Sequence, residues 1–446
     1  MSQLKTFAHR LLTFAPFTLP LWLAASIPSI SLKEPVRLAL YFAGVFAIPV
    51  TLDFVGGKAR QSAPIEHDDG RPYGEYALIP RLLALKFLLL QGLMVYFVVH
   101  RRMGATEVAI LAAMIGLYFG QVGIIVSHEL MHREGRFDHW LADLLLITVT
   151  YPHFSIEHVH GHHIRVATPE DPASARLNEP LYAFLIRSVG GSFAHAWAIE
   201  AERLGRQGKS WLSPQNRMIQ YGALVVAYYA VALYVAGVLG LLAVAVQSAF
   251  AVLSLETVNY IQHYGLQRKK LANGRYEKTG VQHAWNWETR FSGWYFLNLG
   301  RHSEHHRFGT RRYELLAVEK GQPMLPGGVM SMYLTALIPP LWFAVMNPRV
   351  AAVKKAFETG APISAVETPV ARRRRWAGAG IDRWGGWAML AAILVMFAGT
   401  KSHLGYQGGV AIGIALGIVA LIVFLAVVYL PGGGRSPPAP TQAPAE

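Results

Sequence analysis

Nine histidines gathered in four short segments are the residues of this sequence most suited to chemistry. The first segment is 128–132, the second is 158–163, the third contains one histidine near 263, and the fourth is 302–306. Histidines four positions apart lie on one face of an α-helix, so both side chains can point at one metal ion. The candidate ligands are His128, His132, His158, His162, His163, His263, His302, His305 and His306.

Helical spacing also indicates which ligands can point at the same ion, but it does not assign each histidine to one of the two ions. His128 and His132 are four positions apart and can point at one ion. His158 and His162 have the same spacing, which would place them together on one helix face and turn His163 toward a neighbouring ion. The fourth segment repeats the pattern with separations of three and four residues.

The number of ligands favours two metal ions over one. Imidazole suits iron, copper, zinc and nickel, and nine ligands are too many for a single ion of four to six coordination. Iron with an open position can bind O₂, so oxygen activation is the expected chemistry. The sequence contains no cysteine, which excludes a disulfide, a thiolate zinc site and an iron–sulfur cluster within it. Electrons must therefore arrive from another protein.

Other site types fit less well. The first segment has the HExxH pattern of helical zinc proteases, with Glu129 as the general base. Such a protease needs one further ligand and would leave the other histidine segments without a role. The sequence has no GxGxxG or GxxxxGK[ST] loop, so no bound dinucleotide or P-loop nucleotide is expected. Six histidines outside the ligand set are expected at solvent or interface positions: His9, His67, His100, His139, His195 and His403. His160 is expected to point away from the metal, and His153 and His283 are candidates to support the ligands.

Membrane helices are the elements expected to position these ligands. Of the 446 residues, 53% are hydrophobic and 15% are charged, whereas soluble proteins have about a quarter charged residues. An apolar segment of about 20 residues can cross the hydrocarbon core as a helix. The predicted spans are 11–30, 36–56, 78–100, 105–127, 217–239 and 240–262, followed by 384–400 and 408–430. The turn between spans five and six is expected at 237–240.

The histidine segments are all expected on one side of the membrane, just beyond the ends of spans. Basic residues concentrate in the same loops, including the run 372–375, which indicates the cytoplasmic side. The net charge of +14 therefore indicates membrane topology and not nucleic-acid binding. We predict a multi-pass inner-membrane protein whose active site faces the cytoplasm. The expected organisation is a hydroxylase domain at 1–350, a basic linker at 351–383, a transmembrane hairpin at 384–430 and a disordered tail at 431–446.

The combination of HExxH, HxxxHH and HxxHH resembles the membrane fatty-acid desaturase and hydroxylase superfamily. Within it, segments 157–163, 259–265 and 301–306 are most similar to membrane alkane 1-monooxygenases and xylene monooxygenases. Segments 167–176 and 340–350 add to the similarity, which covers about residues 1–350.

This resemblance implies an all-α integral membrane protein with a six-helix transmembrane bundle over a cytoplasmic di-iron site. The apolar segments 384–400 and 408–430 predict two further C-terminal transmembrane helices after the bundle. The resemblance also implies two iron ions held by the nine histidines, O₂ as cosubstrate, and rubredoxin with its reductase as electron donor. The expected reaction is terminal hydroxylation of medium- or long-chain alkanes that enter from the bilayer. Side chains expected to support the ligands are Glu129, Glu157, Asp171, Glu256, Gln262, His283 and Glu304.

Two departures from the family pattern keep alternatives open. Gln262 stands where alkane hydroxylases have glutamate, and an amide carries no charge with which to tune a ligand. The two spans after residue 350 are not part of the family plan.

A xylene-type or fatty-acyl hydroxylase or desaturase would use the same site. A membrane metal carrier would need ionisable residues along the spans, where Glu256 is the main one expected.

Overall fold

The computed structural model describes residues 49–50, 52–53, 56–57, 74–100, 103–319 and 321–360. Within these residues the regular structure is helical, with two isolated β-bridges, so the all-α prediction is confirmed for this part of the chain. The predicted spans 11–30, 384–400 and 408–430, most of 36–56, and the C-terminal tail lie outside the described residues.

Three helical segments in the described part of the chain are long and apolar enough to cross a membrane. They are Tyr76–His100 in helix α4 (Gly74–His100), Ala105–Met131, and α11 (Arg217–His263). The middle segment consists of α5 (Ala105–Tyr118), a π-helical turn (Phe119–Gly123) and α6 (Ile124–Met131). Segments predicted as spans three to six therefore lie on three helices.

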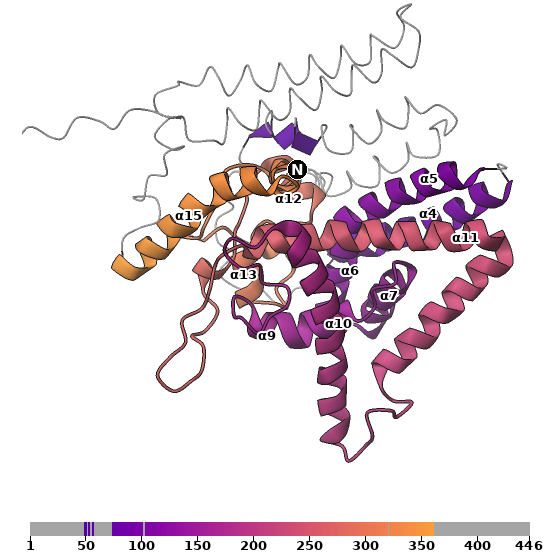
Figure 1. Cartoon of the computed structure of the whole chain (residues 1–446), viewed down its shortest axis with the longest axis horizontal. Helices are drawn as coiled ribbons and strands as arrows, with labels where there is room; N and C mark the ends of the chain where they lie inside the picture. The colour runs from indigo at the N-terminus through magenta and orange to yellow at the C-terminus, as the bar shows by residue number, and fades with distance from the viewer. Residues whose placement is uncertain are drawn as a thin grey trace, which may run out of the picture.

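Helix α11 bends sharply at Gly237, which lies in the segment where a turn was expected. Gly237 has φ 61° and ψ −155°, a backbone conformation open to glycine and strained for other residues. Figure 1 shows the two arms of α11 meeting at a corner. We call residues 217–236 the first arm and residues 238–263 the second arm. The second arm runs beside α5 and α4 and ends at His263 (Figure 1).

Two glycines, Gly116 in α5 and Gly120 in the π-helical turn that follows it, allow this span to approach the second arm closely. A Cβ atom at Gly116 would overlap the carbonyl oxygen of Gln247, and one at Gly120 would overlap the carbonyl oxygen of Ala251. Small residues four apart let two membrane helices bring their backbones into contact. This contact sets the distance between the helix that contains His128 and the helix that ends at His263.

Adding a methyl group at Gly120 is expected to destabilise the protein. In Gly120→Ala the new Cβ would also lie 2.6 Å from Ser254 Cβ, and overpacking of this kind costs roughly 1–3 kcal/mol. Thermal unfolding in detergent should show a lower midpoint for Gly120→Ala. Gly92→Ala in α4 is the control because nothing lies within 4 Å of its Cβ position. Equal midpoints for both variants would contradict the close approach.

The remaining helices are short or lie outside the candidate spans. They are α7 (Arg136–Thr148), α8 (Phe154–Glu157), a π-helical turn (His158–His162), α9 (His163–Arg165), α10 (Leu181–Gly205), α12 (Arg290–Tyr295), α13 (His302–Arg307), α14 (Val329–Ala336), α15 (Pro339–Thr359) and two 3₁₀ turns (Val281–His283 and Tyr313–Leu315). Helix α15 ends at Thr359, with Gly360 in a left-handed conformation after it. The helix thus includes the first nine residues of the segment 351–383, which we expected to be a linker.

Helix α15 fixes the end of α11 next to His263. Trp342 of α15 is fully buried, and its ring centroid lies 5.2 Å from that of Tyr260 and 5.3 Å from that of Tyr264. The Tyr264 hydroxyl donates a hydrogen bond of 2.7 Å to Asn347 Oδ1. The segment 340–350, notable for its resemblance to the alkane 1-monooxygenases, therefore packs directly behind one of the candidate ligands.

A buried carboxylate joins α10 to the start of α11. Glu200 accepts hydrogen bonds from Arg217 Nη2 at 2.7 Å and from Arg203 Nη2 at 2.8 Å. Burial alone would raise the pKa of Glu200, but the hydrogen bonds from Arg203 and Arg217 outweigh it and lower the pKa to about 2. The carboxylate is therefore charged at neutral pH.

Glu200→Gln should weaken this junction by roughly 1.5–3 kcal/mol, the range for hydrogen bonds to a charged group. A carboxyl group whose pKa falls on folding stabilises the fold above its unfolded pKa of 4.5, and that contribution is lost as the pH falls toward 2. Thermal unfolding from pH 7 downward should therefore show a difference between the unchanged chain and Glu200→Gln that shrinks below about pH 4.5. Glu202→Gln, at an exposed position, is the control.

Candidate metal centre

The nine predicted ligands come together in two groups. The first group contains His128, His132, His158, His163 and His305. The second group contains His162, His263, His302 and His306. Within each group, one potential ligand atom from every histidine lies within 4.8 Å of the others. Segments separated by more than a hundred residues thus meet at one place.

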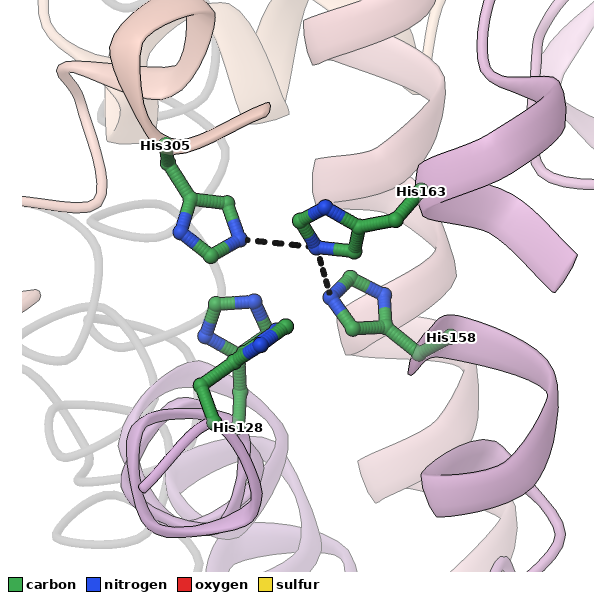
Figure 2. A group of neighbouring side chains, drawn as sticks. His128, His158, His163 and His305 are labelled. Atoms are coloured by element: carbon green, nitrogen blue, oxygen red, sulfur yellow. Dashed lines mark hydrogen bonds between the residues drawn. The ribbon is translucent and has the colours of Figure 1, made fainter. Parts of the chain in front are cut away.

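The rings of the first group face a common point. His163 Nε2 lies 3.1 Å from His158 Nε2 and 3.1 Å from His305 Nε2. Figure 2 shows the rings of His128, His158, His163 and His305 converging from different helices. No single helix could supply this set, because its members come from α6, the π-helical turn with α9, and α13.

In the second group the imidazole Nε2 atoms also lie close together, and this group adjoins the first. His302 Nε2 lies 3.1 Å from His263 Nε2 and 3.1 Å from His306 Nε2. The ring centroids of His163 and His306, which belong to different groups, are 4.7 Å apart. The two groups therefore form one continuous histidine cluster with two centres.

The π-helical turn decides which histidines share a centre, and here our expectation was wrong. His158 and His162 were expected together, on the assumption of an α-helix. The backbone N–H of His163 instead donates to the carbonyl of His158, the five-residue bond of a π-helix. This turn brings His158 beside His163 in the first group and directs His162 to the second.

The other two expected pairings are found in part. His128 and His132 share the first group, as their four-residue spacing predicts. On α13, His302 and His306 share the second group, whereas His305 belongs to the first. Adjacent residues His305 and His306 thus face different centres.

The imidazole nitrogen atoms of the two groups are suited to bind metal ions. Nε2 of His128, His132 and His162 is buried and has no hydrogen-bond partner in the part of the chain that the structure describes. His163 Nε2 lies next to two other Nε2 atoms. Because a neutral imidazole nitrogen is either a hydrogen-bond donor or an acceptor, it cannot form good hydrogen bonds with both of them. Burial lowers the pKa of His158 well below its usual range, with a further contribution from neighbouring histidines. Neutral imidazoles are the form that binds metal.

The pKa values of most other group members outside the membrane spans are also lowered well below normal. Burial is the main cause for each, followed by the charge of neighbouring histidines. These residues are His132, His163, His302, His305 and His306.

Asp171 supports one member of the second group directly. Its Oδ2 lies 2.8 Å from His162 Nδ1 and accepts a hydrogen bond of 2.6 Å from Ser174 Oγ. Burial alone would raise the pKa of Asp171, but His162 outweighs it and lowers the pKa. Burial likewise opposes protonation of His162, yet Asp171 raises its pKa. A carboxylate on Nδ1 leaves Nε2 free for metal and increases the basicity of the ring.

The side chains of the other six residues expected to support the ligands make their hydrogen bonds elsewhere. Within the described part of the chain, Asp171 has the only one of the seven side chains bonded to a histidine of either group, and the backbone of His283 also contacts the His263 side chain. Glu129 is bonded to Arg133, and Glu157 is bonded to His195. Glu256 is bonded to Tyr151, Ser188 and Asn259. Gln262 is bonded to the Leu299 carbonyl, His283 to Glu277, and Glu304 to Arg311 and the Ala317 amide.

Glu157 and Glu256 are buried carboxyls near the second group. Burial, followed by the charge of Asp171, raises the pKa of Glu157 to about 8. Its Oε1 lies 3.0 Å from Nδ1 of His195, which we had expected at a solvent or interface position. Sequence reasoning missed His195 and Ser188 because they come from α10, far along the chain from the carboxyls they contact.

The charge content of the spans also differs from our expectation. Arg81 and Lys86 both lie within the α4 span, in addition to Glu256 in α11. Arg81 forms a two-point ion pair with Asp138 at 2.6 and 2.9 Å, and Lys86 Nζ donates to the Tyr118 hydroxyl at 2.5 Å. These contacts join α4 to α7 and α5 and do not involve the histidine groups.

Comparison with known proteins agrees with this geometry. A family model described as fatty acid desaturase matches residues 105–320, the part of the chain that contains both histidine groups. The alkane 1-monooxygenase 2 of Pseudomonas aeruginosa is 42% identical over 238 residues, which is 53% of this chain and 63% of that protein. The alkane 1-monooxygenase of Acinetobacter baylyi is 38% identical over 307 residues, covering 68% of this chain and 74% of that protein.

The similarity also extends to an enzyme with a different substrate in its name. The xylene/toluene monooxygenase hydroxylase component of Pseudomonas putida is 32% identical over 315 residues, covering 68% of this chain and 80% of that protein. Several alkane 1-monooxygenases are matched over less than two thirds of their own length, at 63% for the Pseudomonas aeruginosa protein and 62% for one from Alcanivorax borkumensis.

Proposed function

This chain belongs to the fatty acid desaturase family, and on that premise we propose that it is a membrane alkane 1-monooxygenase. The observation that carries the proposal is the convergence of nine histidines into two buried groups beneath apolar helices. The proposed reaction converts a terminal methyl group, O₂, two electrons and two protons into a primary alcohol and water.

We propose that the nine histidines hold two iron ions. Two-electron activation of O₂ and hydroxylation of a C–H bond are the chemistry that such a pair of irons supplies when bound. The chain's own contribution is to present imidazole Nε2 atoms at two adjacent centres, with Asp171 orienting His162. Its burial of the groups keeps bulk water away from them.

The position of the two histidine groups supports the proposed substrate class. His128 is in the last turn of the Ala105–Met131 span, and His263 is the last residue of α11. A linear alkane gains roughly 0.8 kcal/mol for each methylene transferred from water to the bilayer, so it reaches the protein through the lipid. A chain that lies along these spans would present its end to the histidine groups, which favours attack at the terminal carbon.

We propose rubredoxin, reduced by its reductase, as the electron donor. The support is the absence of cysteine from the sequence, which leaves no iron–sulfur site of its own. We also propose that the histidine groups face the cytoplasm of a cell with the protein in its inner membrane, in accord with the basic loops on that side.

Product analysis tests the proposal. The iron-loaded full chain in lipid nanodiscs, with rubredoxin and its reductase, would be supplied with labelled O₂ and either alkanes, xylene or a fatty acid. A labelled 1-alkanol that disappears in His132→Ala is the expected result. Exclusive formation of a benzylic alcohol or a modified fatty acid would replace the alkane proposal with one of the two neighbouring activities. No product, combined with rapid metal exchange, would indicate a metal carrier.

A further inference from the structure

Helix α10 has two faces of unusual composition. Its buried face repeats every four residues and includes Ser188, Ser192 and Glu200. Its exposed face is apolar over most of the helix length. From residue 182 to residue 198 the exposed positions are Tyr182, Ala183, Ile186, Gly190, Phe193, Ala194 and Ala198.

This exposed face lacks the charges that a helix in water normally has. Ile186 is 80% exposed, Tyr182 is 55% exposed and Phe193 is 52% exposed. Arg187 lies among these positions, but its guanidinium turns back to Glu179 and the Pro172 carbonyl. The first exposed charged residue of the helix is Glu202. A helix with one face in water would show polar residues on that face. The exposed face of α10 is instead apolar over about 25 Å of its length.

We propose that α10 lies in the interfacial layer of the membrane, on the side of the histidine groups, with its apolar face in the lipid. Figure 1 shows α10 running across the direction of α4, α5 and the second arm of α11, not alongside them. A helix that crosses the direction of the spans runs along the membrane plane. Helix α10 is also not among the candidate spans of the described residues.

The residues at the end of α10 favour lipid over a protein partner. The rings of Trp197 and Trp211 lie edge to face at 6.0 Å, and the exposed Arg206 and Lys209 are close to them in sequence. Tryptophan and basic residues are enriched where a helix meets the membrane–water interface. The first arm of α11 starts soon afterwards and exposes further apolar side chains, including Tyr234 at 91%.

This placement connects the lipid to the metal centre through the opposite face of α10. Ser188 Oγ donates a hydrogen bond of 2.5 Å to Glu256, and His195 Nδ1 lies 3.0 Å from Glu157. Glu157 precedes His158 in the sequence, and Glu256 precedes His263 by less than two helical turns. Insertion of α10 into the lipid surface would thus hold these carboxyls in place beside the histidine groups.

Spin labels can test the proposal without reference to enzyme activity. Because the sequence contains no cysteine, Ile186→Cys and Phe193→Cys each give a single labelling site. The labelled full chain in lipid nanodiscs would be exposed to O₂, which concentrates in lipid, and to a water-soluble nickel chelate. Tyr234→Cys serves as the lipid-facing control, and Glu202→Cys serves as the water-facing control.

The expected ratio of O₂ to nickel accessibility at positions 186 and 193 is close to that at position 234 and several-fold above that at position 202. A ratio equal to that of Glu202→Cys would place the face in water and overturn the proposal. Protection from both reagents would also overturn it, because a protein partner or a second copy of the chain would then cover the helix. None of these outcomes depends on whether the chain hydroxylates alkanes.

Discussion

His305→Ala and His306→Ala will each abolish hydroxylation, but each will do so by emptying a different metal centre. The two residues are adjacent on α13, yet His305 belongs to the group of five and His306 to the group of four. Loss of a direct ligand should reduce activity by more than about 100-fold, beyond the effect of removing an outer hydrogen-bond partner. Metal analysis should show the iron content of each variant falling from two ions toward one per chain.

The control for these variants is His160→Ala. His160 lies within the second histidine segment, but it is exposed and belongs to neither group. It should retain both iron and activity. A His305→Ala chain with full iron content and full activity would remove His305 from the metal centre, and the same comparison applies to His306. Unchanged elution from a sizing column would show that each variant remains folded.

Asp171→Asn will weaken iron binding and activity by about 10- to 100-fold, the usual range for an outer partner of a metal-bound histidine. The carboxylate lies 2.8 Å from His162 Nδ1 and also accepts hydrogen bonds from Ser174 Oγ and the Ala173 amide. Asparagine preserves the shape but removes the charge, so His162 becomes a weaker ligand. Competition with a chelator measures the iron affinity separately from turnover.

Glu170→Gln is the matched control for this substitution. Glu170 is the neighbouring acid, its side chain is 63% exposed, and its nearest ion-pair distance is 3.9 Å, to Arg165. Removing its charge should leave iron affinity unchanged. If both substitutions reduced affinity equally, the effect would come from the net charge of the segment and not from the contact between Asp171 and His162.

The sequence alone determined which residues belong to the candidate site and what kind of helices surround it. The nine histidines were identifiable because their residue type and short spacing are local properties, and the structure brings all nine together. The apolar helices were identifiable because their length and composition are also local. The bend in α11 was expected at 237–240, since glycines interrupt the apolar run there, and it occurs at Gly237.

Only the tertiary structure decided how these residues are arranged. The pairing of His158 with His163 depends on a π-helical turn, whereas spacing arguments assume the α-helical repeat. The contacts of Asp171 with His162, and of Glu157 with His195, depend on how separate helices pack. The exposed apolar face of α10 also depends on packing. The helix as a whole has an ordinary composition, and packing buries its more polar face and leaves the apolar face exposed. Local sequence specifies residue type and helical propensity, while packing between distant segments selects the partners.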